Sequence, residues 1–256
     1  MASATAWVKV SGTWQRILHW YYKLLGTWQQ VKFGYVKVSG VWQLVYAYIV
    51  PYTDNYDTPG TYNVDIPAGA NQLVVYATGG GGSGAAQVVT NGTGGSGGSA
   101  GGTAIRTIPI DPADWGNTAV LVVGAGGAAV TEGSIHYGDG NDGNDSTFNL
   151  TVTAGTFSMT GGKGNKGFST PHATGGTASG GSVNNSGGDS TNDGSSLRYP
   201  IGGDSYWAAG GAGFDNNNGT GNGNAGSYGS GGGAGYNTVP SSSGKGGDGR
   251  IQLGWS

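Results

Sequence analysis

Three copies of a 14-residue pattern of apolar and polar positions fill most of the first 50 residues. The interval separates Lys9, Lys23 and Lys37, then Gly12, Gly26 and Gly40, and then Trp14, Trp28 and Trp42. Each copy predicts a short strand, a two-residue turn that ends in glycine, and a second strand that starts at the tryptophan. A single two-stranded hairpin is marginally stable in water, so we expect the three hairpins to pack together as a pseudo-threefold β-prism.

Aromatic side chains are concentrated in these hairpins. Those that recur with the repeat are Trp7, Trp14, Tyr21, Trp28, Tyr35 and Trp42. They could simply fill the core of the prism, but so short a segment holds more indole than it can enclose. Because a large exposed aromatic patch usually marks an interface, we predict that these residues dock onto a threefold-symmetric partner, such as the end of a trimeric fibre.

Two strands are predicted after the repeat, where apolar residues alternate with polar ones or are β-branched: Tyr62–Ile66 and Leu73–Ala77. Pro59-Gly60 supplies a turn before the first of them. We assign residues 1–50 to fibre attachment, residues 51–78 to a β-strand linker, and residues 79–256 to a separate glycine-rich domain that binds a receptor.

Glycine dominates the rest of the chain, where it fills 51 of the 178 positions from residue 79 onward. Such a content is typical of low-complexity chains. Full disorder is disfavoured, because charged residues are few and apolar stretches recur at Thr103–Ile108, Ala119–Val123, Thr147–Leu150 and Ile251–Leu253.

The glycines recur at every third position in several runs, for example at Gly92, Gly95, Gly98 and Gly101. This period is typical of the extended left-handed helix with three residues per turn, and the runs are too short and too poor in proline for collagen. The predicted fold is therefore mostly irregular and β. It consists of the hairpin prism followed by a bundle, or sandwich, of packed polyglycine II helices with short flanking β-strands.

Segments richer in other residues separate the glycine runs. If the helices run alternately outward and back, five outer loops follow, 85–91, 130–142, 168–174, 214–220 and 236–243. Since loops on a rigid scaffold commonly carry binding, we predict receptor contacts there. The residues concerned are Gln87, Val88, Val89, Ile135, His136, Tyr137, Phe168, His172, Phe214, Asn216, Asn217, Tyr236 and Val239. The returning turns, with Trp115 and with Arg198-Tyr199-Pro200, are expected near the hairpins.

Composition and charge narrow the function classes. The chain has no cysteine, which excludes a disulfide scaffold and a zinc–thiolate site. Residues 1–53 carry a net charge of +5 and residues 54–256 one of −8, so we expect no nucleic-acid partner. The longest apolar run, Leu44–Val50, is too short for a membrane span, and the first residues lack the basic region of a secretory signal. We therefore expect no membrane insertion.

Catalytic and cofactor motifs are weak. Gly162–Gly167 matches a dinucleotide-binding fingerprint and Gly94–Gly98 a nucleophile elbow, but neither has the strand and helix that the chemistry needs. The acidic segment Asp139–Asp145 departs from a calcium-binding loop and is predicted to be a solvated turn. His19, His136 and His172 are isolated. We assign no metal, cofactor or catalytic residue and predict that the protein is not an enzyme.

The arrangement resembles the receptor-recognising adhesin at the distal tip of the long tail fibres of T-even-type bacteriophages. The resemblance rests on the Lys-x-x-Gly-x-Trp-Gln units, on Ile66-Pro67-Ala68-Gly69 ahead of Gly79–Gly82, on the interrupted glycine runs, and on the ending Gly247-Asp248-Gly249-Arg250-Ile251. It implies a virion protein, made in the host cytoplasm, that caps the trimeric distal fibre subunit with one adhesin per trimer. It also implies a polyglycine II sandwich whose outer loops contact an outer-membrane protein such as a porin and so initiate adsorption.

Two other classes of function remain open. A tail-spike-like depolymerase would cut surface glycan with paired carboxylates, and the dense acidic cluster of Asp139, Asp142 and Asp145 lies in a predicted Gly/Asn-rich loop. A structural or ice-binding polyglycine protein is disfavoured by the aromatic outer loops and by the hairpins.

Overall fold

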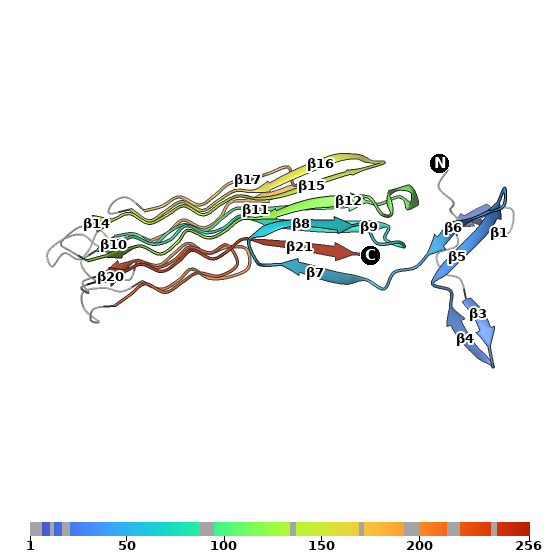
Figure 1. Ribbon diagram of the computed structural model, residues 1–256, viewed down its shortest axis with the longest axis horizontal. Helices are drawn as coiled ribbons and strands as arrows, with labels where there is room; N and C mark the ends of the chain where they lie inside the picture. The colour runs from blue at the N-terminus through green and yellow to red at the C-terminus, as the bar shows by residue number, and fades with distance from the viewer. Residues whose placement is uncertain are drawn as a thin grey trace.

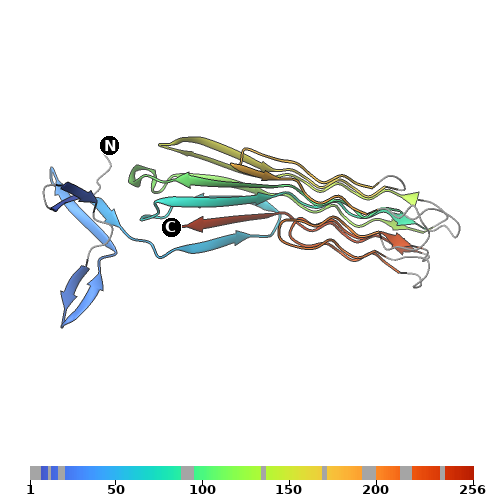
Figure 2. The same ribbon diagram turned by 180° about the vertical axis from the view of Figure 1, so that it is seen from behind.

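The computed structural model shows an elongated body and, at one end of it, three small hairpins (Figure 1). The structure describes residues 7–10, 13–16, 21–87, 95–133, 137–168, 172–191, 200–213, 221–236 and 240–256. For residues 7–10 and 13–16, and for Gln43, Val45 and Tyr137, it describes the backbone alone. The half of the body nearest the hairpins is a β-sandwich, and the other half is a bundle of extended glycine-rich segments (Figure 2).

Two five-stranded antiparallel sheets form the sandwich. The first has the order β18 (Val183–Asn185), β11 (Thr103–Pro109), β9 (Gln72–Thr78), β21 (Arg250–Trp255), β7 (Tyr52–Tyr56). The second has the order β17 (Ala178–Ser179), β16 (Gly155–Gly161), β15 (Ser146–Val152), β12 (Thr118–Val123), β8 (Gly60–Asp65). Strands from residues 52–78 therefore share both sheets with strands from the glycine-rich part of the sequence.

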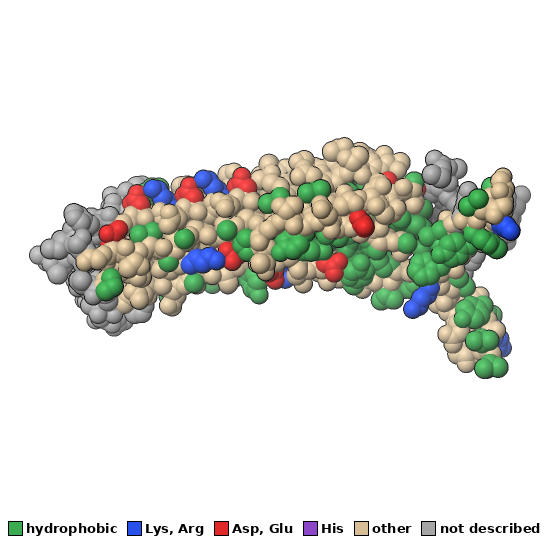
Figure 3. Space-filling view, viewed as in Figure 1, with side chains coloured by type: hydrophobic (Ala, Val, Ile, Leu, Met, Phe, Trp, Pro, Cys, Tyr) green, Lys and Arg blue, Asp and Glu red, His purple; other side chains and the backbone are tan. Residues whose placement is uncertain are grey.

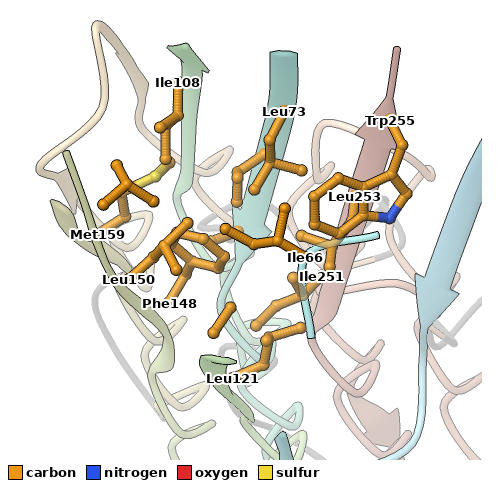
Figure 4. Packing of buried hydrophobic residues seen from close by; sticks show 14 of the residues in the cluster. Ile66, Leu73, Ile108, Leu121, Phe148, Leu150, Met159, Ile251, Leu253 and Trp255 are labelled. Atoms are coloured by element: carbon orange, nitrogen blue, oxygen red, sulfur yellow. The ribbon is translucent and has the colours of Figure 1, made fainter. Parts of the chain in front are cut away.

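The core of the sandwich follows from the alternation of apolar residues along these strands. In β9, Leu73, Val75 and Ala77 are fully buried, whereas Val74 and Tyr76 between them are half-buried on the outer face. The inward side chains of the two sheets meet in one cluster, to which Phe148, Leu253 and Trp255 contribute (Figure 4). β8 contains the first predicted strand except for Ile66, β9 contains all of the second, and the four apolar stretches of the glycine-rich part also form strands.

A short 3₁₀ turn, η1 (Pro112–Asp114), joins β11 to β12 at the hairpin end of the sandwich. The carboxylate of Asp114 accepts hydrogen bonds from the N–H and the hydroxyl of Thr153, at 2.7 and 2.8 Å. The indole of Trp115 donates to the carbonyl oxygen of Ala70. Trp115 thus lies at the end of the body where the sequence predicted it.

Backbone N–H groups in the centre of the bundle point to different neighbours in a cycle of three. In segment 79–85, one set of N–H groups donates to segment 96–102: Gly79 to Gly102, Gly82 to Ser99 and Ala85 to Ser96. A second set donates to segment 141–144: Gly80 to Asn144 and Ser83 to Asn141. The third set donates to segment 244–247: Gly81 to Gly247 and Gly84 to Gly244. The direction of donation therefore returns at every third residue, and three neighbouring segments accept.

The carbonyl groups of the same segment bond to three further neighbours. Segment 164–167 donates to two of them, Gly164 to Gly80 and Gly167 to Ser83. Segment 232–235 donates to two more, Gly232 to Gly82 and Gly235 to Ala85. Gly127 donates to the carbonyl of Gly81. Segment 79–85 is thus surrounded by six other segments and is fully buried. In this part of the molecule, the backbone itself is the core.

Close backbone approach explains why the bundle requires glycine. A Cβ atom on Gly79, Gly82 or Gly84 would lie closer than 3.0 Å to a carbonyl group of an adjacent segment. Serine is the main polar exception, and its hydroxyl joins the backbone network: buried Ser83 accepts from the N–H of Asn141, and Ser99 from that of Asn165. A short side chain is therefore tolerated where it replaces a backbone acceptor.

Short strands mark the end of the body that lies farthest from the hairpins, which we call the tip (Figure 1). They are β10 (Ala86–Gln87), β13 (Thr131–Glu132), β14 (Tyr137–Gly138), β19 (Gly235–Tyr236) and β20 (Ser241–Ser242). Six segments outside the described residues are bounded by residues at this end: 88–94, 134–136, 169–171, 192–199, 214–220 and 237–239.

The sequence predicted only five tip loops and placed Arg198-Tyr199-Pro200 near the hairpins. For Pro200 this was wrong, because its carbonyl oxygen accepts from Ala234, the residue before β19. Arg198 and Tyr199 lie outside the described residues. The error arose because 186–191 and 200–204 each hold a single pair of glycines, Gly187-Gly188 and Gly202-Gly203, and not a longer glycine run, although they bond in the same way.

The three N-terminal repeats form three hairpins, as predicted. They pair β1 (Trp7–Val10) with β2 (Thr13–Arg16), β3 (Tyr21–Leu24) with β4 (Thr27–Gln30), and β5 (Phe33–Val38) with β6 (Val41–Ala47). The register is the same in each, since Lys9, Lys23 and Lys37 lie opposite Trp14, Trp28 and Trp42. In the second and third turns, Leu25-Gly26 and Ser39-Gly40 all have positive φ, between 48° and 88°.

The structure does not confirm the pseudo-threefold prism. Each hairpin is a two-stranded sheet of its own, and no sheet joins two of them within the described part of the chain. The β3–β4 hairpin projects away from the rest of the molecule in both ribbon views (Figures 1 and 2).

Candidate functional site

Aromatic side chains on the hairpins are largely uncovered. Trp28 is 66% exposed and Trp42 is 65% exposed, and Tyr21 and Tyr35 are exposed to a similar degree. Figure 3 shows these hairpins as a region rich in hydrophobic side chains. Four of the six predicted docking residues therefore present their rings to solvent, whereas the side chains of Trp7 and Trp14 lie outside the described ones.

A lysine accompanies each of the two described tryptophans. The Nζ atoms of Lys23 and Lys37 each lie 5.9 Å from the ring centroid of the tryptophan opposite, Trp28 and Trp42. The geometry follows from the shared register, and it allows a cation–π contact on one side of each ring. An apolar surface with a fixed cation beside each indole suits a partner that combines apolar and acidic groups.

At the tip, the structure buries two residues that were predicted to contact a receptor. Gln87 has no exposed surface, and its side-chain carbonyl accepts a 2.8 Å hydrogen bond from the N–H of Gly95. Tyr236 is 5% exposed in β19, beside β10. The prediction of direct receptor contact was wrong for the side chains of these two residues, because they pack beneath the surface.

Phe168 and His172 bound one of the six tip segments. Phe168 is half-buried, and the Nζ atom of Lys166 lies 5.3 Å from its ring centroid. His172 is exposed. Tyr137 is in β14, with its backbone paired to Gln87 and its side chain outside the described ones. The other predicted residues lie outside the described part of the chain: Val88, Val89, Ile135, His136, Phe214, Asn216, Asn217 and Val239.

The acidic cluster is a ladder along the bundle, and its prediction as a loop or solvated turn was wrong. Asp139, Asp142 and Asp145 lie three residues apart on the extended segment 137–145, which returns from the tip. The ammonium groups of Lys163 and Lys166 reach Asp142 and Asp139 at 2.8 and 3.2 Å. Figure 3 shows the resulting row of alternating charges along one edge of the body.

Backbone hydrogen bonds explain why these aspartates recur every third residue. The carboxylates of Asp142 and Asp145 accept from the N–H groups of Lys166 and Lys163. Asp189, Asp204 and Asp248 do the same for the N–H groups of Gly175, Gly210 and Gly126. At the surface of the bundle, an aspartate thus replaces the carbonyl acceptor that a neighbouring segment supplies in the interior.

The ion pair between Asp142 and Lys163 shifts the pKa of both side chains. Burial alone raises the pKa of Asp142, but hydrogen bonds from the Lys163 ammonium and the Lys166 N–H, together with the positive charges, bring the pKa below its usual value. The pKa of Lys163 is raised, chiefly by its hydrogen bond to Asp142. Both groups are therefore held in their charged forms. Within the described residues, no group of three His, Asp or Glu side chains is placed to hold a metal ion.

Sequence reasoning missed an aromatic cluster where the sandwich meets the bundle. The ring of Trp207 contacts those of Tyr76 and Tyr206, and its indole donates to the hydroxyl of Thr78. The guanidinium of Arg250 lies 4.8 Å from the ring centroids of both Trp207 and Tyr228. These contacts fix two turns of the bundle against the first sheet. The sequence signal was the adjacent pair Tyr206-Trp207, together with Tyr228, within glycine-rich segments.

The two glycine motifs do not adopt the structures that their sequence patterns suggest. Gly162–Gly167 is an extended bundle segment whose N–H groups bond to other segments or to aspartate. Ser96, at the centre of the elbow pattern, is fully buried and accepts from the N–H of Phe168. Over the described residues, the chain also forms no helix that is long and apolar enough to cross a membrane.

Comparison with known protein families identifies the class of the body. The model of the glycine-rich domain family matches residues 57–256, which include both sheets and the whole bundle. The chain belongs to that family. No curated protein sequence matches the chain.

Proposed function

We propose that this protein is the adhesin at the distal tip of a bacteriophage long tail fibre. This proposal rests on the separation of two ends by the length of the body: exposed aromatic hairpins lie at one end, and the short strands β10, β13, β14, β19 and β20 lie at the other (Figure 1). An adhesin that caps a fibre needs one end for attachment and one for recognition. Membership of the glycine-rich domain family and the resemblance of the whole chain agree with this proposal.

In this proposal the bundle consists of polyglycine II helices. Two features support the assignment: hydrogen-bond direction repeats every third residue, and segment 79–85 has six neighbours. A helix with three residues per turn sends successive backbone groups out at intervals of one third of a turn, which is the pattern observed. Such a bundle is stiff because each segment is bonded on several sides, and it would hold the tip segments in fixed positions.

The hairpins would attach to the trimeric distal subunit of the fibre, one adhesin to each trimer. The exposed rings of Trp28 and Trp42 provide apolar area, and the repeat offers three similar contacts to a threefold partner. Isolated two-stranded sheets are marginally stable, so docking would also supply the order that each hairpin lacks alone. We propose that the prism predicted from the sequence forms only on the fibre.

The tip would bind an outer-membrane protein of the host, such as a porin, through the segments bounded by residues such as Phe168 and His172. The test is binding of the purified protein to outer-membrane extracts of host and non-host cells, followed by identification of the captured protein. Exchange of tip segment 169–171 for that of a relative with another host should change the cells that are bound. Ala154→Ser, at an exposed position in the turn between β15 and β16, is the control. Unchanged cell specificity after exchange of all six tip segments would contradict the proposal.

A surface-glycan depolymerase is the weaker candidate. A glycosidase of that kind needs a general acid with a raised pKa, whereas Asp142 has a lowered pKa and is paired with Lys163. The acidic ladder therefore stabilises the bundle. Shortening of purified surface glycan by the protein would reopen this alternative.

A further inference from the structure

The turn of the β3–β4 hairpin carries a leucine that the protein itself leaves uncovered. Leu25 is 97% exposed, far more than Tyr22, Leu24 or Trp28 on the same hairpin. Its φ is +48°, in the left-handed region that residues other than Gly, Asn and Asp seldom adopt. Leucine at this position thus places an apolar side chain in solvent, at a turn position that any residue other than glycine occupies at a backbone cost.

The internal repeat shows that the turn does not need leucine. The equivalent residue is Ser11 in the first repeat and Ser39 in the third. Ser39 has almost the same φ as Leu25, +49°, and the glycines that follow, Gly40 and Gly26, also agree. Local folding therefore gives no reason for leucine in the second turn. A leucine that the turn does not require, and whose side chain is almost fully exposed, suggests a role outside the chain.

We propose that Leu25 is an anchor that inserts into an apolar socket on the end of the trimeric fibre. The inference rests on the proposed function and names a contact within it. The fibre is the favoured occupant because the β3–β4 hairpin projects from the end of the molecule opposite the tip (Figure 1). The same hairpin exposes the ring of Trp28, which we assign to docking, so the turn extends that apolar surface.

Threefold symmetry of the partner leads to a second expectation. A trimer offers three equivalent sockets, whereas this chain carries leucine at only one of its three turns and serine at the others. Two sockets would then face Ser11 and Ser39. Ser39→Leu should fill a second socket from a turn of the same geometry and should strengthen attachment.

The experiment measures binding of the full-length protein to the trimeric distal fibre subunit of the same phage, purified without its tip protein. Leu25→Ser restores the residue of the other repeats and should weaken binding by about tenfold or more, the effect of losing a buried leucine contact. Leu25→Asn keeps the turn, because asparagine tolerates positive φ, and should weaken binding equally. If Leu25→Asn binds as tightly as the parent protein, the anchor is refuted.

Two further measurements separate this inference from the proposed function. Trp28→Ala and Trp42→Ala should each reduce fibre binding; if they do while Leu25→Ser does not, the anchor fails and the docking end stands. If none of these variants reduces binding, the assignment of the hairpins to fibre docking fails as well. Sedimentation of the free protein tests the other possible occupant, a second copy of this chain. If the free protein self-associates and Leu25→Ser abolishes the self-association, the leucine contacts a second copy and the proposal is overturned.

Discussion

At the residue scale, glycine in the bundle is required by contact between backbones. The ideal Cβ position of Gly82 is blocked by the carbonyl group of Asn165, and that of Gly84 by the carbonyl group of Gly233. Those carbonyl groups belong to segments held by hydrogen bonds on several sides, so they cannot withdraw as a flexible side chain would.

Gly82→Ala should therefore destabilise the body strongly. We expect a loss of at least about 1–3 kcal/mol in the free energy of unfolding, the usual effect of overpacking a core. Gly133→Ala is the matched control, because no heavy atom lies within 4 Å of its Cβ position and its φ is not in the left-handed region. Thermal unfolding of the two variants compares them, and equal midpoints would show that backbone contact does not set the glycine pattern.

The contribution of the Asp142–Lys163 pair to the free energy of unfolding should depend on pH. The folded pKa of Asp142 is lowered, so its contribution is present above the unfolded pKa of about 3.9 and is lost as the pH falls through the folded value. The folded pKa of Lys163 is raised, so its contribution is present below about pH 10.4 and is lost as the pH rises through the folded value.

Asp142→Asn should lower stability at pH 7 by about 1 kcal/mol or less, because the pair is exposed and screened by solvent. The asparagine side chain can still accept from the N–H of Lys166, which limits the loss further. The difference from the parent protein should shrink as the pH falls from about 4 towards the lowered folded pKa of Asp142, where the parent carboxyl also becomes protonated. Urea unfolding of both proteins from pH 2 to 7 measures it, and a difference that grows in acid would contradict the assignment.

At the scale of elements, sequence patterns predicted what depends on neighbours along the chain. The 14-residue repeat gave the hairpins and their glycine turns, and alternation gave β8 and β9. The patterns did not predict what depends on packing between distant segments. Asp142 serves as an acceptor only because segment 162–167 lies beside it, and Gln87 is buried only because β14 and β19 flank β10. Neither neighbour is visible in the local sequence.

Hairpin geometry can be tested without changing any packing contact. Gly40 has φ +88° and no heavy atom within 4 Å of its Cβ position, so Gly40→Ala changes only the backbone preference. We expect a loss of about 1 kcal/mol in the stability of the β5–β6 hairpin. Cross-strand nuclear Overhauser effects between Lys37 and Trp42 should weaken, while those between Lys23 and Trp28 stay constant as the internal control. Unchanged effects at Lys37 would show that the turn does not determine the pairing.

At the scale of the whole molecule, the continuous backbone network sets how the two ends relate. The sandwich passes directly into the bundle, since β9 leads into segment 79–85 and segment 244–249 leads into β21. The cluster of Trp207, Arg250 and Tyr228 fixes the turns at this junction. Within the described residues this network joins the sandwich to the tip strands without interruption, so we expect that binding at one end of the body does not alter the shape of the other.

Attachment and recognition should therefore be energetically independent. Trp42→Ala should weaken fibre binding and leave cell binding of the free protein unchanged, whereas exchange of tip segment 169–171 should do the reverse. In the double variant, each change in binding free energy should equal that of the corresponding single variant to within about 0.5 kcal/mol, as for sites that share no partners. Titrations against the purified fibre subunit and against host cells provide the two readouts. A larger coupling would mean that the bundle transmits a conformational change, and a stiff polyglycine II body would then be the wrong description of this protein.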